Sequence, residues 1–245
     1  MTEPLELLFL GSGNGFAPKG RYWSSFLLNG RYLFDCCPVA LPHLKKCGVP
    51  LEQIDAVFIT HFHADHLYGL PFLLFEYGYV TPRDRALTIV GPPGIERRVR
   101  MLTETGFPNV FSREIGSQLV FEEAADRRVG EVAGLRYVAR AVDHVEDFPC
   151  FGYRAEVSGR TVAYSGDTMM CDALVDLAAG ADAFVVECSC WDGPCGPHLC
   201  PDDLRELRRR LGPTPQFLLT HLDAGERDLG IENTRLAADL ATFTF

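Results

Sequence analysis

Short apolar runs alternate with polar and glycine-rich stretches along the first half of the chain. Runs of about four to eight apolar residues between turn residues predict strands, and longer apolar-periodic stretches predict helices. Asn29-Gly30 joins two apolar runs and predicts a tight hairpin, because both residues accept positive φ. The expected strands are 5–10, 23–28, 31–36, 54–60 and 86–90, and the expected helices are 40–47, 67–77 and 95–105.

The second half has the same style, with strands and helices interleaved. The helix expected over 202–211 has the strongest signals, because Asp202 and Asp203 begin it and three arginines end it, which complements the helix dipole. No linker rich in Ser, Gly or Pro divides the chain, so we expect residues 1–245 to form one layered α/β domain. The other expected strands are 118–122, 134–143, 151–157, 160–165, 182–187 and 216–220, and the other helices are 171–179 and 232–240.

Three of the seven histidines fall within the segment His61-Phe62-His63-Ala64-Asp65-His66. Alternate side chains of an extended segment share a side, so His61 and His63 point the same way. The following turn into a helix brings Asp65 and His66 toward them. Imidazole and carboxylate groups that converge in this way are typical ligands of divalent transition metals. A chance cluster of solvated histidines is the alternative, which four such groups directly after a buried strand disfavour.

Three further ligand-type residues stand at the ends of expected strands: His144, Asp167 and His221. Taken singly, each is as compatible with a capping Asp or a structural His as with a ligand. Strand ends at one sheet edge are where α/β folds gather functional groups. Together, the three residues therefore complete a ligand set large enough for two metal ions.

These motifs, in this order, resemble those of the metallo-β-lactamase superfamily over essentially the whole chain. The superfamily signature HxHxDH reads HFHADH at 61–66, and SGDT and LLTHL carry the later aspartate and histidine. The resemblance implies a four-layer αββα sandwich with two metal ions at one edge of its sheets. Carried over to this sequence, it assigns one ion to His61, His63 and His144 and the other to Asp65, His66 and His221, with Asp167 between them.

Within the superfamily, the chain is most similar to the RNase Z-like branch. The glycine-rich loop 11–15, Arg21, Ser24-Ser25, Asp35-Cys36 and the FGYR stretch at 151–154 all match that branch. RNase Z enzymes, however, carry a tRNA-gripping arm between the third motif and the GDT. Only 22 residues separate these motifs here, so we expect the arm to be absent.

Two smaller departures concern single residues. The His-Glu-Ala-Thr of the branch reads Val186-Glu187-Cys188-Ser189, and the glycine after Asp-Cys is Cys37. With the missing arm, these departures place tRNA processing in doubt. Small phosphodiesterases of the branch, such as the phosphonate-pathway cyclic phosphodiesterase, are the nearer analogy.

A water molecule bound to a metal ion loses much of its proton affinity, its pKa falling from 15.7 to about 7. We therefore expect a dinuclear metal-dependent hydrolase, a phosphodiesterase that attacks small or nucleotide-like phosphate esters with a metal-bridging hydroxide. Five imidazoles and two carboxylates suit zinc first, with manganese or iron as alternatives. Asp65 belongs to the catalytic group as well as to the ligands.

Four residues outside the ligand set are candidates for roles in the reaction. His198 is the expected general acid, and Glu187 is expected to orient it or a ligand histidine. Asp35 is a second candidate for orienting a ligand, and Arg21 a candidate contact for substrate phosphate. A surface-loop histidine, a buried capping aspartate and a solvated arginine are the alternatives for His198, Asp35 and Arg21.

Charge narrows the choice of partners. The chain has 33 acidic and 23 basic residues, a net charge of −10, which opposes strong nucleic-acid binding.

No apolar run is long enough to span a membrane, and the acidic start Met1-Thr2-Glu3-Pro4 is unlike a signal peptide. We therefore expect a cytoplasmic enzyme with a small-molecule ester substrate. A homodimer is compatible with the resemblance, because superfamily members often dimerise.

The nine cysteines are expected to be mostly reduced thiols. Cys188, Cys190, Cys195 and Cys200 surround His198, so a further, structural metal is the alternative there, although the spacings match no standard zinc pattern. The aromatic residues that follow the metal motif are expected to be mostly core, with one or two against a substrate ring: Phe72, Phe75, Tyr77 and Tyr79.

Three other functions stay open at this point. The first is another superfamily hydrolase, acting on a thioester, lactone, β-lactam or sulfate ester; the flank Val142-Asp143-His144-Val145 lacks the Pro-Gly-His-Thr of glyoxalase-type thioester hydrolases. The second is an RNase Z-type tRNA 3′ endonuclease. The third is a non-catalytic metal or thiol sensor, which the retention of all seven ligand positions disfavours.

Overall fold

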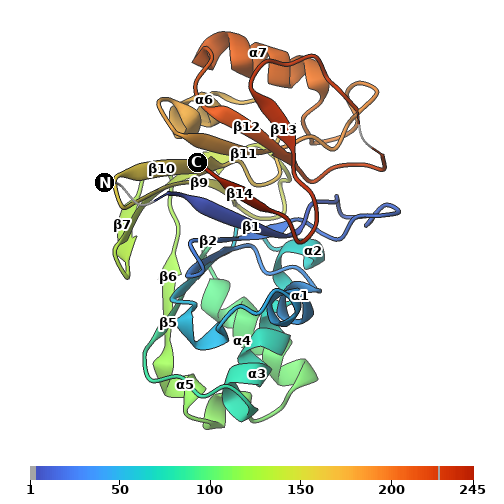
Figure 1. The fold of residues 1–245 in the computed structure, drawn as a ribbon. Coiled ribbons are helices and arrows are strands. Elements are labelled where there is room, and N and C mark those ends of the chain that lie inside the picture. The colour runs from blue at the N-terminus through green and yellow to red at the C-terminus, as the bar shows by residue number, and fades with distance from the viewer. Residues whose placement is uncertain (1–3, 226) are drawn as a thin grey trace.

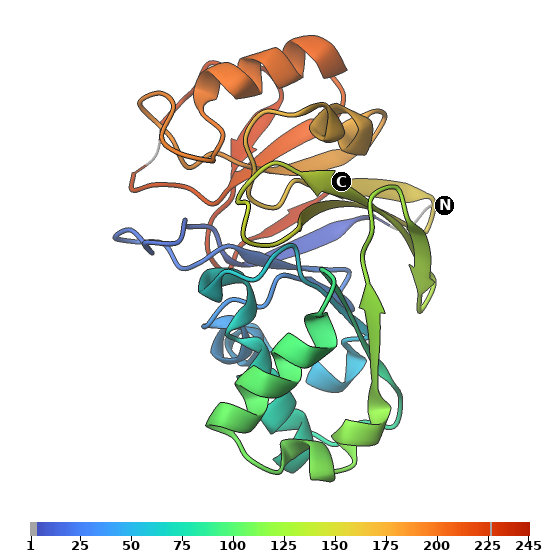
Figure 2. The ribbon, with the colours of Figure 1, turned by 180° about the vertical axis from the view of Figure 1, so that it is seen from behind.

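The computed structural model describes residues 4–225 and 227–245, which form the expected four-layer αββα sandwich (Figure 1, and from behind in Figure 2). The strands of these residues build two seven-stranded sheets that pack face to face. Residues 1–3, with most of the acidic start, lie outside the described part. No helix within that part is long and apolar enough to cross a membrane. That the whole chain is one domain stays a prediction.

The first sheet begins with antiparallel strands and continues with parallel ones. Its outer face is covered by helices (Figure 1), of which α1 (Ala40–Lys46), α3 (Leu70–Tyr79) and α4 (Ile95–Gly106) contribute most of the buried side chains. Shorter elements on this side are α2 (Ala64–Leu67), α5 (Ile115–Gln118), η1 (Leu51–Gln53) and η2 (Val110–Ser112). The strand order is β14 (Thr242–Thr244), β1 (Glu6–Gly11), β2 (Ser25–Leu28), β3 (Tyr32–Phe34), β4 (Ala56–Phe58), β5 (Leu87–Gly91), β6 (Leu119–Glu123).

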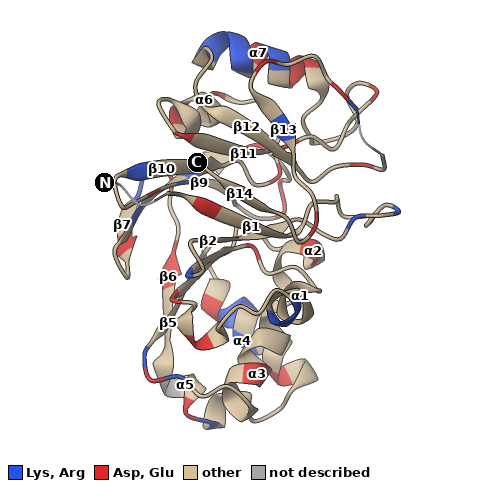
Figure 3. Ribbon diagram, viewed as in Figure 1, with Lys and Arg blue, Asp and Glu red and all other residues tan. Residues whose placement is uncertain are grey.

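The second sheet carries helices α6 (Asp172–Ala178) and α7 (Pro201–Leu211) on its outer face. Helix α7 matches the expectation for 202–211: its first turn is acidic and its last turn basic, as Figure 3 shows by colour. The strand order is β13 (Thr234–Leu236), β12 (Gln216–Thr220), β11 (Ala183–Glu187), β10 (Arg160–Tyr164), β9 (Cys150–Val157), β8 (Leu135–Val142), β7 (Val129–Val132).

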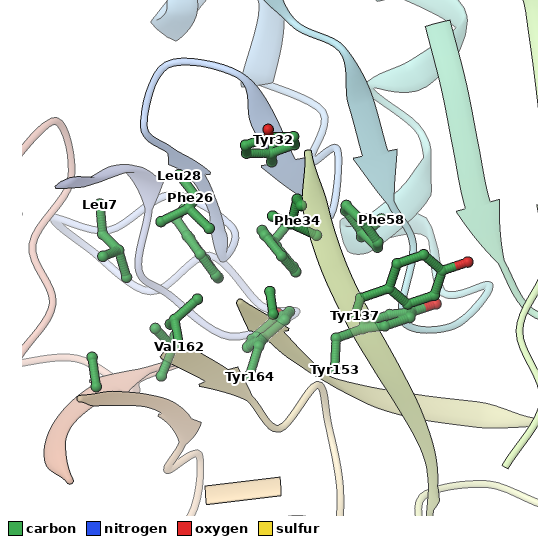
Figure 4. Close-up of a cluster of buried hydrophobic side chains, with 14 of the residues drawn as sticks. Leu7, Phe26, Leu28, Tyr32, Phe34, Phe58, Tyr137, Tyr153, Val162 and Tyr164 are labelled. Carbon is green, nitrogen blue, oxygen red and sulfur yellow. The ribbon is translucent and has the colours of Figure 1, made fainter. Parts of the chain in front are cut away.

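Aromatic side chains fill the space between the two sheets (Figure 4). Phe34 stacks between Phe26 and Phe58 of the neighbouring strands, with ring centroids 4.8 Å apart in each pair. Tyr153 and Tyr164 of the second sheet meet these rings edge-on. Such fully buried rings contribute both burial energy and directional packing, so they fix how the sheets, and the loops at their edges, lie relative to one another.

The predicted hairpin at Asn29-Gly30 is confirmed, since both residues have positive φ, 49° and 68°. The helix expected over 232–240 is wrong. That segment contains β13, which pairs in parallel with β12, and Leu240 lies at φ 61°, where a helix cannot continue. Ala237 joins the core between the sheets, and Leu236 packs against the core under α6 and α7. Strands β7 and β14 were not expected from the sequence.

Candidate metal centre

The HFHADH segment changes direction immediately after strand β4. His61 lies in extended backbone beyond the strand, and His63, at φ −63° and ψ 150°, is the last extended residue before α2. Helix α2 then carries Asp65 and His66 on its first turn. The strand-to-helix turn thus aims all four polar side chains into one volume, as the sequence predicts.

The first group of converging atoms contains ring nitrogens of three histidines. His63 Nδ1 lies 2.9 Å from His61 Nε2 and 3.2 Å from His144 Nε2. His144 reaches the group from the loop after β8, 81 residues away in sequence from His63. His61 is completely buried and His144 nearly so.

The second group contains Asp65, His66 and His221. Asp65 Oδ2 lies 3.2 Å from His66 Nε2 and 3.4 Å from His221 Nε2. His221 follows β12 directly and adopts φ 54°, in the left-handed region of backbone conformation. Non-glycine residues in this conformation are held there by their surroundings and cluster at functional sites.

Asp167 lies between the two groups. Its Oδ2 is 3.1 Å from His221 Nε2 and 3.3 Å from His66 Nε2, and it is 3.8 Å from His61 Nε2 and 4.0 Å from His144 Nε2. Asp167 comes shortly after β10 and directly after Gly166. Gly166 has φ 60°, and a Cβ there would lie 2.9 Å from the carbonyl oxygen of Phe151, so a side chain does not fit at this position. The structure therefore brings all seven predicted ligand residues together, in two groups that share Asp167.

Hydrogen bonds on the far side of each ring determine which nitrogen has a free lone pair. His144 Nδ1 donates to the carbonyl of Pro197, and His66 Nδ1 donates to Asp35, so Nε2 is the unprotonated nitrogen of each neutral ring. His61 Nδ1 donates to the hydroxyl of Thr60, which itself donates to Asp35. Lone pairs of these rings consequently face one another and the carboxylates.

This arrangement of donors suits a cation. His66 Nε2 is buried without a hydrogen bond, although it faces Asp65 and Asp167. Burial lowers the pKa of His66, but Asp167, Asp65 and Asp35 together raise it well above its usual value. Burial likewise opposes ionisation of Asp167, yet His221 and His66 hold its pKa well below the usual range. The same carboxylate field that holds a proton here attracts a divalent metal ion, and the donor set suits one.

A buried carboxylate, Glu187 at the end of β11, organises the other side of the centre. One of its oxygens accepts hydrogen bonds from His198 Nδ1 at 2.7 Å and from the backbone N–H of Thr168 at 2.9 Å. The other oxygen accepts from the hydroxyl of Ser189 at 2.9 Å, and that hydroxyl accepts from His221 Nδ1 at 2.6 Å. Glu187 thus orients both His198 and His221.

His198 lies at the edge of the centre, with 21% of its side chain exposed. Its ring centroid is 4.9 Å from that of His144 and 5.3 Å from that of His221. Burial lowers the pKa of His198, but the hydrogen bond to Glu187 and its charge raise it above the usual value. Its position fits the predicted general acid.

Asp35 lies beneath the second group, fully buried. One oxygen accepts from His66 Nδ1 and from the hydroxyl of Tyr164, each at 2.7 Å, and the other accepts the backbone N–H of Thr60 at 2.8 Å. Thr60 and Ser189 were not identified from the sequence, because a single hydroxyl residue gives no pattern. Their position next to Asp35 and Glu187 appears only in the fold.

An open cleft of about 470 Å³ lies over the centre. Asn14 and Gly15 of the glycine-rich loop, with Phe16 directly after it, form one wall, and Ser189, Cys195 and His198 form another. Arg21 stands at the base of that loop, where its guanidinium donates to Ser12 Oγ and to the carbonyls of Ala237 and Gly225. It is not among the residues that line the cleft, so substrate binding by Arg21 stays a prediction.

The aromatic residues after the metal motif do not line the cleft either. Tyr77 is buried, as expected, but Phe72, Phe75 and Tyr79 are partly exposed on the outer face of α3. The last three contact one another or Phe107 of the neighbouring helix end. The prediction that one of these rings meets substrate finds no support in the geometry. Dimerisation stays a prediction as well.

Two of the nine cysteines differ from the expectation of reduced thiols. Cys190 and Cys195 form a disulfide with Cα atoms 5.4 Å apart, which closes the loop before His198. The loop reverses direction between them, which brings two residues five apart into bonding distance. Cys188 and Cys200 are buried free thiols, and no Cys-containing metal cluster occurs among the described residues.

The family model described as "Anti-Pycsar protein Apyc1" matches residues 5–232. Among curated relatives, a ribonuclease Z of Geobacillus kaustophilus is 27% identical over 312 aligned positions, which cover 98% of this chain and 99% of the relative. The alignment is longer than the 245 residues of this chain, so the relative carries insertions. Here β9, a two-residue turn and β10 fill most of the space between His144 and Asp167, and no arm protrudes there.

Solved structures with the same fold span the full chain. The metallo-β-lactamase fold protein YhfI from Bacillus subtilis has a TM-score of 0.80 at 19% identity and covers 99% of this chain and 100% of its own. A diphosphatase from the PhnP family has a TM-score of 0.73 at 19% identity, with 98% of each chain covered. These likenesses confirm the fold predicted from the motifs.

Proposed function

Because this chain belongs to the family of the anti-Pycsar protein Apyc1, among the RNase Z-like hydrolases of the metallo-β-lactamase superfamily, we propose that it is a phosphodiesterase. Its substrates are small or nucleotide-like phosphate esters. The observation that carries the proposal is the position of Asp167 Oδ2, 3.1 to 4.0 Å from four histidine nitrogens of two ligand groups, at the floor of an open cleft.

The chain is a metal-dependent hydrolase, and we propose that it holds two ions. His61, His63 and His144 would hold one, Asp65, His66 and His221 would hold the other, and Asp167 belongs to both groups. Zinc is our first candidate, with manganese or iron as alternatives. When bound, two divalent cations supply a water molecule of lowered pKa and positive charge that offsets the charge of phosphoryl oxygens.

The protein's own proton donor in this scheme is His198. Because Nδ1 is held by Glu187, the ring carries its transferable proton on Nε2. Glu187 stabilises the protonated ring and keeps it beside His144 and His221. We propose that His198 Nε2 donates this proton to the leaving oxygen of the ester.

The shape and charge of the chain favour small substrates over tRNA. A cleft of about 470 Å³ is within the ordinary range for small-molecule sites. The ribonuclease Z relatives carry insertions that this chain lacks, and its net charge of −10 disfavours a polyanion. The name of the PhnP-family neighbour, a diphosphatase, fits phosphate chemistry on a smaller molecule.

A substrate panel tests the proposal. We expect the metal-loaded protein to hydrolyse bis(p-nitrophenyl) phosphate at least about tenfold faster than thioester, lactone, β-lactam and sulfate-ester substrates at equal concentration. We also expect no cleavage of a tRNA precursor at low salt. Faster turnover of any non-phosphate ester reassigns the enzyme within its superfamily, and a fully metal-loaded sample that is inert on every class indicates a sensor.

His198→Ala is expected to affect substrates according to their leaving group. A poor alkoxide leaving group needs the proton of His198, so its hydrolysis should fall by roughly 10²- to 10⁴-fold. A p-nitrophenolate leaves without protonation, so its hydrolysis should fall far less. Rates on an alkyl ester and an aryl ester of one phosphate compound give the comparison.

Equal losses on both esters would refute the acid role of His198. The matched control is His43→Ala, since His43 is a buried histidine of α1 that hydrogen-bonds Leu10 outside the cleft. It should change the rates of both esters by the same factor.

A further inference from the structure

An aromatic side chain, Phe16, lies directly after the glycine-rich loop, at the cleft over the metal centre. Phe16 is 94% exposed, the highest value among the described large apolar side chains. It lines the same cleft as Asp65, His198 and His221. A lone, exposed phenylalanine at the mouth of a polar site leaves its whole ring face available to a ligand.

The backbone that carries this ring is tied to the rest of the fold. The backbone N–H of Phe16 donates to Asn14 Oδ1 at 3.1 Å, and the N–H of Asn14 donates to the carbonyl of Leu222 at 3.0 Å. Trp23 Nε1 donates to the carbonyl of Gly15 at 3.0 Å. Both residues before Phe16 are thereby tied to the framework, one of them directly to the residue after the ligand His221.

The loop also passes very close to the ligands. A Cβ on Gly15 would lie 3.2 Å from Asp65 Oδ2, so the backbone next to Phe16 runs against that carboxylate. Phe16 therefore follows a residue that lies against a ligand carboxylate, and it lines the cleft in which the rest of a phosphate ester would lie if its phosphoryl group faced the ligands. Such a position offers a face for stacking and no group for hydrogen bonding.

We propose that Phe16 determines specificity by stacking on a flat ring, a nucleobase or an aryl group, of the bound phosphate ester. The inference rests on the proposed function, because it takes the bound substrate to be a phosphate ester. It narrows the substrate class from phosphate esters in general to esters that carry a planar aromatic substituent. Stacking tolerates many rings, because every base offers a π face.

Competitive inhibition by two matched monoesters tests the proposal. Ribose 5-phosphate keeps the phosphate and the sugar of adenosine 5′-monophosphate and has a hydroxyl group in place of the base, so the change in the variant of each inhibition constant against bis(p-nitrophenyl) phosphate reports on the ring contact. In Phe16→Ala the constant for adenosine monophosphate should rise roughly 5- to 100-fold, as for loss of one base stack, and that for ribose phosphate should stay within about twofold. Phe16→Trp should retain tight binding of adenosine monophosphate.

The other outcomes overturn the proposal. If the inhibition constants of both monoesters change equally in Phe16→Ala, or if neither changes, the ring does not contact the base. If Phe16→Ala has a lower oligomeric state than the unaltered protein, a second subunit covers the ring instead. If bis(p-nitrophenyl) phosphate is not hydrolysed, the proposed function fails. Direct calorimetric titration of the same two monoesters into metal-loaded protein then still measures the effect of Phe16.

Discussion

Asp167→Asn is expected to reduce hydrolysis of bis(p-nitrophenyl) phosphate by about a thousandfold or more. The substitution keeps the shape of the side chain but removes the charge that lies 3.1 to 4.0 Å from four histidine nitrogens. Metal ions supply several kcal/mol of transition-state stabilisation, and each 1.4 kcal/mol corresponds to about tenfold in rate. Loss of one bound ion is therefore enough for an effect of this size.

Two measurements check this result. Metal analysis of the purified variant should show fewer equivalents than the unaltered protein, and kcat/KM should fall in parallel. Asp143→Asn is the matched control, because Asp143 is an exposed aspartate next to His144 and outside the ligand groups. Full activity of Asp167→Asn with unchanged metal content would show that Asp167 does not hold the ions.

Asp35→Asn is expected to weaken both the fold and the metal centre. The buried carboxylate accepts hydrogen bonds from His66, Tyr164 and two donors of Thr60. An asparagine accepts at one atom only, and its amide group would face a donor. Breaking this network should lower the free energy of unfolding by about 3 kcal/mol. Asparagine tolerates the φ of 53°, so backbone strain adds nothing.

The effect on metal binding separates a positioning role of Asp35 from a purely structural one. Without its carboxylate, His66 loses the partner that fixes its tautomer, so metal affinity should fall about 10- to 100-fold. Chemical denaturation of the metal-free protein and titration with zinc measure the two effects. Tyr164→Phe removes one donor and leaves His66 untouched, so it should cost about 1 kcal/mol and keep the affinity. Unchanged affinity in Asp35→Asn would refute the positioning role.

The ligand residues were predictable because the sequence encodes them locally. HFHADH places four ligands around a single strand-to-helix turn, and His144, Asp167 and His221 each follow a strand whose apolar run is easily recognised. The hydroxyl groups of Thr60 and Ser189 were not predictable, since Thr60 meets Asp35, and Ser189 meets His221, only through packing of segments 25 and 32 residues apart.

Other differences have the same physical origin. The segment 232–240 has the apolar content of a helix, but pairing of Thr234–Leu236 with β12 prevails over that preference. The aromatic residues of α3 suggested a substrate contact by their nearness in sequence to the metal motif, yet the helix turns three of them outward. Phe16 gave no signal, because one aromatic residue in a glycine-rich loop is compatible with any role.

The most direct test of the account is anomalous diffraction from a crystal of the metal-loaded protein. We predict two peaks: one bonded to His61, His63 and His144, the other to Asp65, His66 and His221, with Asp167 in contact with both. A single peak, or ions bound away from these seven side chains, would contradict the dinuclear centre and the chemistry built on it.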